Sequence, residues 1–146
     1  EIILAGRRIN ESVPNRIASR LIKDSIKSKL INRDDFRVLI LGATFKENCP
    51  DIRNSKVKEL VDELKNYNIE VGLYDPFVSS QLIQDIFCAT AVDIKTTDKK
   101  WPIVIMAVNH SEFIEPNEYL RSICENAKLL YDLKSVINYS NTHFSL

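Results

Sequence analysis

The sequence predicts an α/β domain in which a mostly parallel sheet lies between helices on both faces. Apolar runs of strand length alternate with amphipathic segments of helical period from Phe36 onward. Two of these runs, residues 36–41 and 102–108, are almost continuously apolar, which is typical of strands covered on both faces of a parallel sheet. The chain has 146 residues with balanced charge, a length that suits one domain with a hydrophobic core.

Residues 1–31 are expected to form a helical lead-in that is interrupted near Pro14. Apolar residues then recur at helical spacing, namely Ile17, Leu21, Ile22, Ile26 and Leu30. The lead-in either packs on the sheet or is shared with another domain or subunit. Its basic residues lack interleaved aromatic residues, so a solvated face or a protein interface is favoured over a nucleic-acid surface.

Residues 32–146 are expected to form a single domain. Strands are predicted at 36–41, 69–74, 88–92, 102–108 and 128–132. Helices are predicted at 57–67, 79–87 and 118–124, with Asn54 or Ser55 as the N-cap of the first, and the tail at 138–146 is expected to be irregular. The resulting architecture is a Rossmann-like three-layer sandwich.

The connection at residues 42–55 is the candidate ligand site. It is about twice as long as a routine strand-to-helix connection, and it lies at the carboxyl edge of the predicted sheet, where parallel sheets bind ligands. Its polar side chains are Thr44, Lys46, Asn48, Asp51, Arg53, Asn54 and Ser55. Together with the helix N-terminus that follows, they suit a phosphate-bearing ligand. Asp51 and Arg53 can also simply pair with each other, with Lys46 solvated.

Other residues near this edge leave alternatives open. Gly42 is the only glycine of the connection, so the G-x-G-x-x-G fingerprint of a complete NAD-binding domain is absent. Asp75 ends the second strand and can hold a ribose, but Asp75-Pro76 also reads as a plain turn, which is favoured. His110 follows the fourth strand without an evident acidic partner and is expected at the rim or as a helix cap.

Composition narrows the function classes. The zero net charge gives no electrostatic reason to expect a nucleic acid or an acidic membrane as partner, and no apolar run is long enough to span a bilayer. Cys49, Cys88 and Cys124 are widely spaced, so neither a disulfide framework nor a metal site is expected, and free thiols favour the cytoplasm. Cys49 lies outside any Gly-rich motif, with no histidine near it in sequence, and is not expected to be a nucleophile.

Three motifs resemble one enzyme family. Residues 44–55 read Thr-Phe-Lys-Glu-Asn-Cys-Pro-Asp-Ile-Arg-Asn-Ser, residues 5–10 read Ala-Gly-Arg-Arg-Ile-Asn, and residues 74–76 read Tyr-Asp-Pro. These segments resemble the C-terminal, UDP-binding domain of the UDP-glucose/GDP-mannose dehydrogenases, and in particular the branch that oxidises UDP-N-acetylhexosamines for bacterial surface polysaccharides. Residues 5–10 resemble the family's central helix, which joins the two domains and builds the dimer.

The resemblance implies oxidation of a UDP-sugar at C6 in two hydride transfers to NAD. The family's catalytic cysteine and its NAD-binding turn lie in Gly-rich motifs that this chain lacks, so no catalytic residue is assigned and the chain alone is expected to be inactive. The implied substrate-binding residues are Thr44, Phe45, Lys46, Glu47, Asn48, Cys49, Pro50, Asp51, Ile52 and Lys134. Lys46 is the best single candidate for a direct polar contact, and Arg53 would reach toward NAD on the other domain.

The same resemblance implies a homodimer formed through residues 1–31. It leaves the sugar open among UDP-N-acetylglucosamine, UDP-N-acetylgalactosamine and UDP-N-acetylmannosamine. The alternative is a stand-alone regulatory or interaction module of the same fold, in which the helix at 1–31 drives dimerisation and the connection at 42–55 contacts a protein.

Overall fold

The structure is a computed structural model that describes residues 13–134 and 142–145. Its elements are α2 (Val13–Lys27), β1 (Arg37–Leu41), α3 (Val57–Asn66), β2 (Glu70–Tyr74), α4 (Ser80–Asp85), β3 (Thr90–Ala91), β4 (Ile103–Met106), α5 (Ser111–Ile114), α6 (Glu118–Asn126), β5 (Leu129–Asp132) and β6 (Thr142–Ser145). The strands form one sheet in the order β3-β2-β1-β4-β5-β6, and every neighbouring pair is parallel. The predicted fold class is confirmed.

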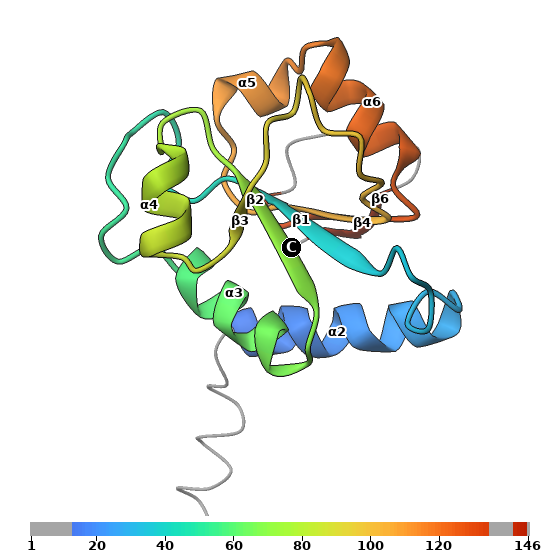
Figure 1. Cartoon of the computed structure of the whole chain (residues 1–146). Coiled ribbons are helices and arrows are strands. Elements are labelled where there is room, and N and C mark those ends of the chain that lie inside the picture. Colours follow the sequence, from blue (N-terminus) through green and yellow to red (C-terminus); the bar gives the residue numbers. More distant parts are fainter. Residues whose placement is uncertain (1–12, 135–141, 146) are drawn as a thin grey trace, which may run out of the picture.

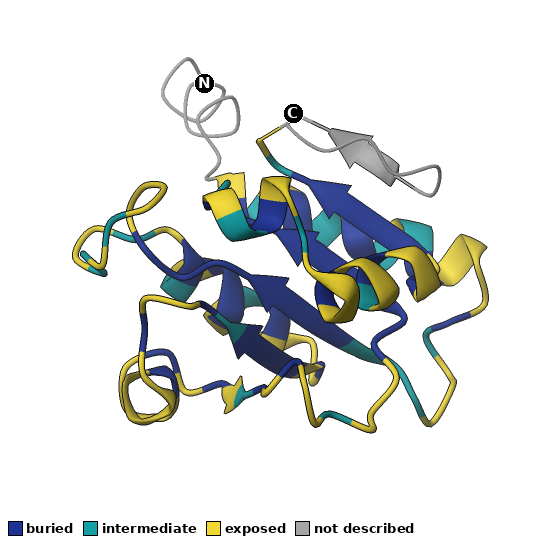
Figure 2. Ribbon diagram, turned by 90° about the horizontal axis from the view of Figure 1, so that it is seen from above, coloured by how far each residue is buried: buried dark blue, intermediate teal, exposed yellow. Residues whose placement is uncertain are grey.

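Helices cover both faces of this sheet and make the three-layer sandwich (Figure 1). α2 and α3 lie against one face, while α5 and α6 lie against the other. Figure 2 shows the strands drawn in colour as largely buried, with exposed residues along the outer sides of the helices. A strand between two such layers buries both sets of alternating side chains, which explains the continuous apolar runs of β1 and β4.

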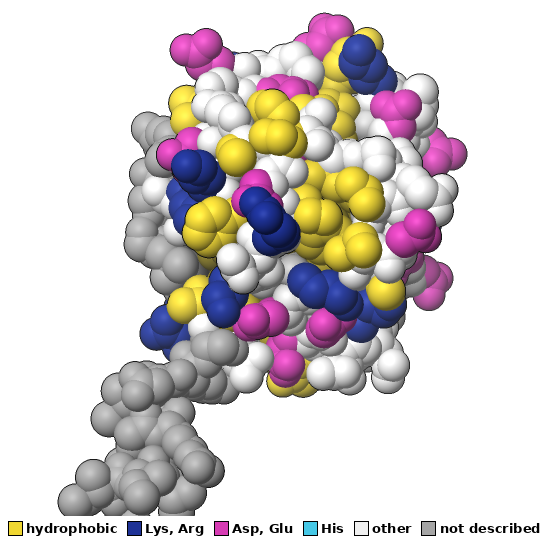
Figure 3. All heavy atoms as spheres, turned by 90° about the vertical axis from the view of Figure 1, so that its left-hand side faces the viewer, with side chains coloured by type: hydrophobic (Ala, Val, Ile, Leu, Met, Phe, Trp, Pro, Cys, Tyr) yellow, Lys and Arg dark blue, Asp and Glu magenta, His cyan; other side chains and the backbone are white. Residues whose placement is uncertain are grey.

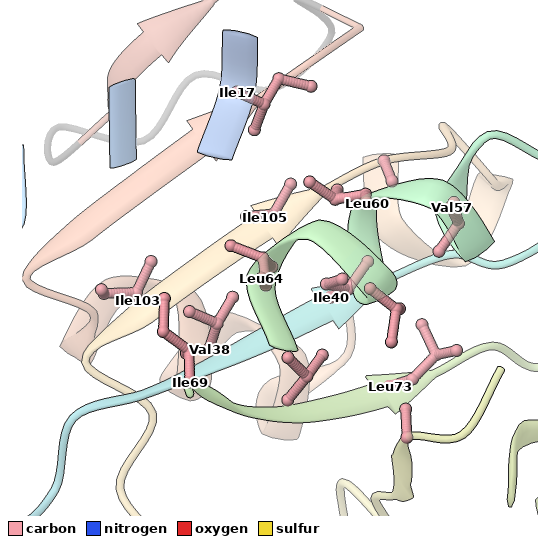
Figure 4. Packing of buried hydrophobic residues seen from close by; sticks show 14 of the residues in the cluster. Ile17, Val38, Ile40, Val57, Leu60, Leu64, Ile69, Leu73, Ile103 and Ile105 are labelled. Carbon is pink, nitrogen blue, oxygen red and sulfur yellow. The ribbon is translucent and has the colours of Figure 1, made fainter. Parts of the chain in front are cut away.

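The core under α3 shows why this segment is helical. Val57, Leu60, Val61 and Leu64 recur at the spacing of one helix face, and all four are buried. They pack on the side chains of Val38, Ile40 and other buried strand residues (Figure 4). Because Leu39 and Leu41 point to the opposite face, β1 is buried on both sides.

The opposite face of the sheet is closed by a second apolar cluster. Phe113 of α5 and Leu120 of α6 pack there with Leu39, and Trp101 joins them from the segment before β4. Gly72 lies under the Trp101 ring, which leaves no room for a Cβ atom at that position of β2. Trp101 is therefore a packing residue.

α2 is part of the main core. Ile17, Ala18 and Leu21 are buried in the same cluster as α3, and the Tyr131 hydroxyl of β5 donates a 2.8 Å hydrogen bond to Asp24. The predicted apolar face is wrong at Ile26, which is 56% exposed near the C-terminal end of α2. Residues 1–12, which include the Ala-Gly-Arg-Arg-Ile-Asn segment, lie outside the described residues.

Three local predictions need correction. β6 lies within the tail at 138–146, which was expected to be irregular. The strand was not predicted because its sequence, Thr-His-Phe-Ser, is too short and too polar to show the alternation of a strand. α5 was not predicted, since a helix of four residues has no readable periodicity. The N-cap of α3 is Lys56, whose backbone is already helical, while the Ser55 hydroxyl accepts a hydrogen bond from the Val57 N–H at 3.2 Å.

Candidate functional site

The connection between β1 and α3, residues 42–56, lies at the carboxyl edge of the sheet. It sits beside the ends of β2 and β4, on the left-hand side of Figure 1. The chain leaves β1 for β2 on one side, and the later strand β4 pairs with β1 on the other side. Strand order therefore reverses at β1, and this is the place where open parallel sheets bind ligands.

The start of this connection is held by both neighbouring strands. Gly42 adopts a left-handed backbone with φ of 102°, and an ideal Cβ atom there would lie 2.7 Å from the Cβ of Val108. Its N–H donates to the Tyr74 carbonyl at 2.8 Å, while the next N–H, that of Ala43, donates to Asp75 Oδ2 at 2.6 Å. The direction in which the chain leaves β1 is therefore set by glycine and by the end of β2.

The tip of the connection closes on itself. The Phe45 N–H donates to the Asp51 carbonyl at 2.7 Å, and the Thr44 hydroxyl donates to the Lys46 carbonyl at 2.9 Å. Asn48 and Ser111 exchange two hydrogen bonds, because the Ser111 N–H donates to Asn48 Oδ1 and the Asn48 amide donates to the Ser111 hydroxyl, both at 3.0 Å. The tip is thus tied to the N-terminus of α5.

The structure brings the predicted residues of this connection together. Thr44 is buried, and Cys49, Asp51 and Ile52 are partly buried. The exposed members are Phe45, Lys46, Glu47, Asn48, Pro50 and Arg53. The buried members anchor the connection, while the exposed ones present a ring, an amide, two cations and the Glu47 carboxylate to solvent.

Asp51 and Arg53 form the pair that the sequence left open. Arg53 Nε and the Arg53 N–H both reach Asp51 Oδ1, at 3.0 Å and 2.9 Å. The side-chain hydrogen bond from Arg53 holds the pKa of Asp51 below its ordinary value, and the same bond raises the pKa of Arg53. The Arg53 side chain remains 85% exposed, so its pairing within the connection does not bury it.

His110 and Asp75 form a buried contact that the sequence interpretation missed. Both side chains have an exposed fraction of 0%, and His110 Nε2 lies 2.8 Å from Asp75 Oδ2. Asp75 also accepts from the Phe77 N–H at 2.7 Å. The expectation of a rim histidine was wrong, because the parallel register brings together residues that are 35 positions apart in sequence. The alternative of a helix cap is confirmed, since His110 is the N-cap residue of α5. The predicted turn at Asp75-Pro76 is present, with the Val78 N–H donating to the Asp75 carbonyl at 3.2 Å, but the Asp75 side chain is buried as well. The available signal was that Asp75 and His110 lie in the segments that follow the two strands flanking β1.

Lys134 lies beside a mainly apolar cavity of about 320 Å³ at the same edge. The cavity is lined by Val13, Pro14, Ile17, Lys56, Val57, Leu60, Ala107, Leu133 and Lys134. Lys56 ends the β1–α3 connection, so the structure places Lys134 near the end of that connection. A larger cavity of about 590 Å³ lies at the opposite, amino edge and includes Lys95, Lys100 and Lys128. The carboxyl edge is the better candidate, because in parallel sheets it is the ligand-binding edge.

Figure 3 looks onto the side of the molecule that carries the β1–α3 connection. Hydrophobic side chains gather there, interspersed with basic and acidic ones. Large apolar side chains are exposed in the connection and in the segment that follows β2, and among them Phe45 is 55% exposed and Phe77 is 42% exposed. A face with exposed rings and cations suits a ligand that combines a flat base with phosphate groups.

Sequence comparison places the chain among known proteins. A family profile described as "UDP-glucose/GDP-mannose dehydrogenase family, UDP binding domain" matches residues 39–139, which include the β1–α3 connection, Asp75, His110 and Lys134. The chain belongs to this family. It corresponds to the part described as the UDP binding domain, as the resemblance had predicted.

Individual relatives agree with this assignment. The UDP-N-acetyl-D-glucosamine 6-dehydrogenase of Pseudomonas aeruginosa is 40% identical over 147 residues, which cover 100% of this chain and 34% of that protein. The enzyme of the same name from Salmonella typhi is 41% identical and covers 94% of this chain and 32% of that protein. The chain therefore spans about a third of the length of these relatives.

Solved structures of dehydrogenases share the fold. The UDP-D-ManNAc dehydrogenase of Pyrococcus horikoshii matches 95% of this chain and 31% of its own, with a TM-score of 0.69 and 25% identity. The UDP-N-acetyl-mannosamine dehydrogenase Cap5O of Staphylococcus aureus matches 96% of this chain and 31% of its own, with a TM-score of 0.65 and 26% identity. Both matches extend over almost the whole chain.

The described residues contain no group of three or more histidine, cysteine or acidic side chains that could hold a metal ion. No helix within residues 13–134 is long and apolar enough to cross a membrane. No disulfide joins the three cysteines, which all lie in the described residues, and Cys49 is partly buried in the connection. Both ring nitrogens of His110 already have partners, so this histidine is not available to deprotonate Cys49.

Proposed function

We propose that this domain binds the UDP part of a UDP-sugar through the connection at residues 44–52. The observation that carries the proposal is the placement of this connection. The connection lies at the point where strand order reverses, and a hydrogen bond from Asn48 to His110 holds it there. The chain belongs to a family described by its UDP binding domain. The whole protein is proposed to be an NAD-dependent UDP-N-acetylhexosamine 6-dehydrogenase of polysaccharide biosynthesis, with this chain as its C-terminal domain.

The exposed groups of the connection match the chemistry of UDP. Lys46 offers an ammonium group to the diphosphate, and the N-terminus of α3, ten residues long, adds a positive dipole end. The exposed ring of Phe45 offers a flat apolar surface to uracil or ribose. Lys134 is proposed as a further contact, since it lies with Lys56 at the same edge.

A titration of the ¹⁵N-labelled chain with UDP tests this proposal. Backbone amide resonances should shift for residues 44–52 and for Lys134, while NAD at the same concentration should leave these resonances unmoved. NMR is suited to weak binding by a domain that forms only part of a site. Shifts confined to other regions, or no shifts at millimolar UDP, would contradict the proposal.

Lys46→Ala is the matched test of the site. Loss of one charged hydrogen bond should weaken UDP binding by about tenfold or more. Lys27→Ala is the control, because Lys27 is an exposed lysine in the last turn of α2, which leads into the amino end of β1. Equal UDP affinity for both variants would remove Lys46 from the site.

The NAD-dependent reaction needs a more complete protein. Replacing the corresponding third of the Pseudomonas aeruginosa relative with this chain should give a chimera that reduces NAD with a UDP-N-acetylhexosamine, followed at 340 nm. The three candidate sugars can be compared in this assay. Arg53→Ala should raise the KM for NAD more than the KM for the UDP-sugar, because Arg53 is proposed to face the cofactor. A folded chimera that oxidises none of the sugars would count against the proposed reaction.

Residues 1–31 are proposed to form a homodimer interface in the cytoplasm. One supporting observation is Ile26, a large apolar side chain that is 56% exposed on α2. Deleting the segment would also remove Ile17 and Leu21 from the core, so a surface change is the better test. Ile26→Asp should convert a dimer into a monomer in light scattering coupled to gel filtration. An unchanged mass would place the interface elsewhere.

A further inference from the structure

We propose that His110 is a positioning residue of the β1–α3 connection and acts as a neutral imidazole with its proton on Nε2. Its task is to hold the Asn48 amide, and with it the tip that presents Lys46. That this positioning serves UDP binding rests on the proposed function. The hydrogen bonding itself stands on the geometry alone.

The hydrogen bonds around the ring define the tautomer. The Asn48 backbone N–H donates to His110 Nδ1 at 2.9 Å, and a backbone amide is always a donor, so Nδ1 carries no proton. The ring proton is therefore on Nε2, which lies 2.8 Å from Asp75 Oδ2 and 3.2 Å from Thr44 Oγ1. The Thr44 hydroxyl already donates to the Lys46 carbonyl, so its oxygen is free to accept.

Burial makes this arrangement specific. The side chains of His110 and Asp75 are both fully buried, and a buried polar group without a partner destabilises the folded state. Asp75 Oδ2 accepts from both Nε2 and the Ala43 N–H, and Asp75 Oδ1 accepts from Phe77. Every polar atom of the imidazole and the carboxylate thus has a partner.

The connection depends on this ring for its buried anchor. Asn48 adopts a left-handed backbone with φ of 53°, a conformation that needs support from neighbouring contacts. The other bonds of its side chain, to Ser111, are exposed to water. His110 in turn is fixed by the rings of Phe77 and Phe113, whose centroids lie 4.8 Å and 5.4 Å from its own. The segment between β4 and α5 therefore sets the position of a loop that starts at the end of β1.

Three substitutions at His110 separate the possible roles. His110→Asn places an amide oxygen near the position of Nδ1 and keeps the acceptor for Asn48. His110→Gln places its amide near the position of Nε2 and keeps a donor toward Asp75, but it loses that acceptor. His110→Phe keeps the packing against the two rings and loses both polar contacts.

The test combines NMR of the ring with UDP binding. In the wild-type chain, ¹⁵N imidazole spectra should show an unprotonated Nδ1 and a protonated Nε2, and the Asn48 amide should exchange slowly. Slow exchange should persist in His110→Asn and be lost in His110→Gln and His110→Phe. UDP affinity should follow the same order, with a loss of about tenfold or more for Gln and Phe and a much smaller loss for Asn.

A proton on Nδ1 in the wild-type chain would overturn the proposal. Equal losses of Asn48 protection in the Asn and Gln variants would also overturn it, because they would indicate a role in packing alone. Should the Phe variant fail to fold, the comparison of Asn with Gln still decides. Absence of UDP binding by the wild type would refute the proposed function. The tautomer of His110 and the exchange rate of the Asn48 amide would still test the positioning role of His110.

Discussion

Gly42→Ala is the substitution for which the structure predicts the largest effect from the smallest chemical change. Gly42 has φ of 102°, a region that L-residues rarely adopt, and this strain costs about 1–3 kcal/mol. The added methyl group would also lie 2.7 Å from Val108 Cβ and 2.9 Å from the Val108 nitrogen. Because a backbone atom cannot move aside as a side-chain tip can, overpacking adds about 1–3 kcal/mol.

One term opposes these two. Alanine restricts the unfolded chain more than glycine does, which stabilises the folded state by about 0.4–1 kcal/mol. The expected net loss in the free energy of unfolding is therefore about 3 kcal/mol, within a range of about 1–6 kcal/mol. That loss is a large part of the total stability of a domain of this size.

Urea unfolding followed by tryptophan fluorescence measures this change. Trp101 is the only tryptophan in the sequence and is 5% exposed, so it reports directly on the core. The control is the difference between Asn68→Gly and Asn68→Ala, because Asn68 is an exposed residue with φ of 59° and this pair of variants adds a Cβ atom at a left-handed position without a close neighbour. If Gly42→Ala lost no more stability than this control, the close approach of Val108 would not constrain the start of the connection.

Three further substitutions test the core and its ion pairs. Leu64→Ala should lower the free energy of unfolding in urea by about 2–5 kcal/mol because it opens a cavity under α3, and a loss below about 1 kcal/mol would contradict the packing. The hydrogen bond from Lys99 lowers the pKa of Glu70, so this exposed pair should contribute less than about 1 kcal/mol at neutral pH. The difference between wild type and Glu70→Gln should shrink as pH falls below the ordinary value of 4.5, and a constant difference would exclude the pair as its cause. Tyr131→Phe removes the hydrogen bond to Asp24 and should lower the free energy of unfolding by about 1 kcal/mol. Since burial and then the bond to Asp24 raise the pKa of Tyr131, this difference should persist in urea unfolding up to about pH 10, and its loss well below that pH would contradict the contact.

The fold was predictable where burial dictates composition. β1 and β4 lie in the middle of the sheet and are covered on both faces, so apolar residues fill every position that the helices cover. β3 has only two residues, and β6 lies at the opposite edge of the sheet. Edge strands this short do not have a characteristic pattern of apolar residues. Helix ends were less predictable for a similar reason. The N-cap of α3 depends on the backbone conformation of Lys56 and on the hydrogen bond that Ser55 accepts from Val57. Hydrophobic periodicity does not encode either of these.

The location of the site was predictable from the sequence, but the buried contacts that hold it in place were not. An unusually long strand-to-helix connection pointed to residues 42–55, because loop length is visible in the sequence. Its anchors were hidden, since Asp75 and His110 belong to strands that are neighbours of β1 only after the sheet has formed.

In a parallel sheet, however, the segments that follow the two strands flanking the reversal of strand order lie close together above the central strand. A carboxylate at one of these positions and an imidazole at the other are therefore candidates for a buried pair, even when neither has a partner nearby in sequence. Applied to this chain, that rule selects Asp75 and His110, the two side chains whose contact the structure shows at 2.8 Å. The tip of the connection can remain exposed for a ligand because the buried His110 ring holds the Asn48 backbone in place.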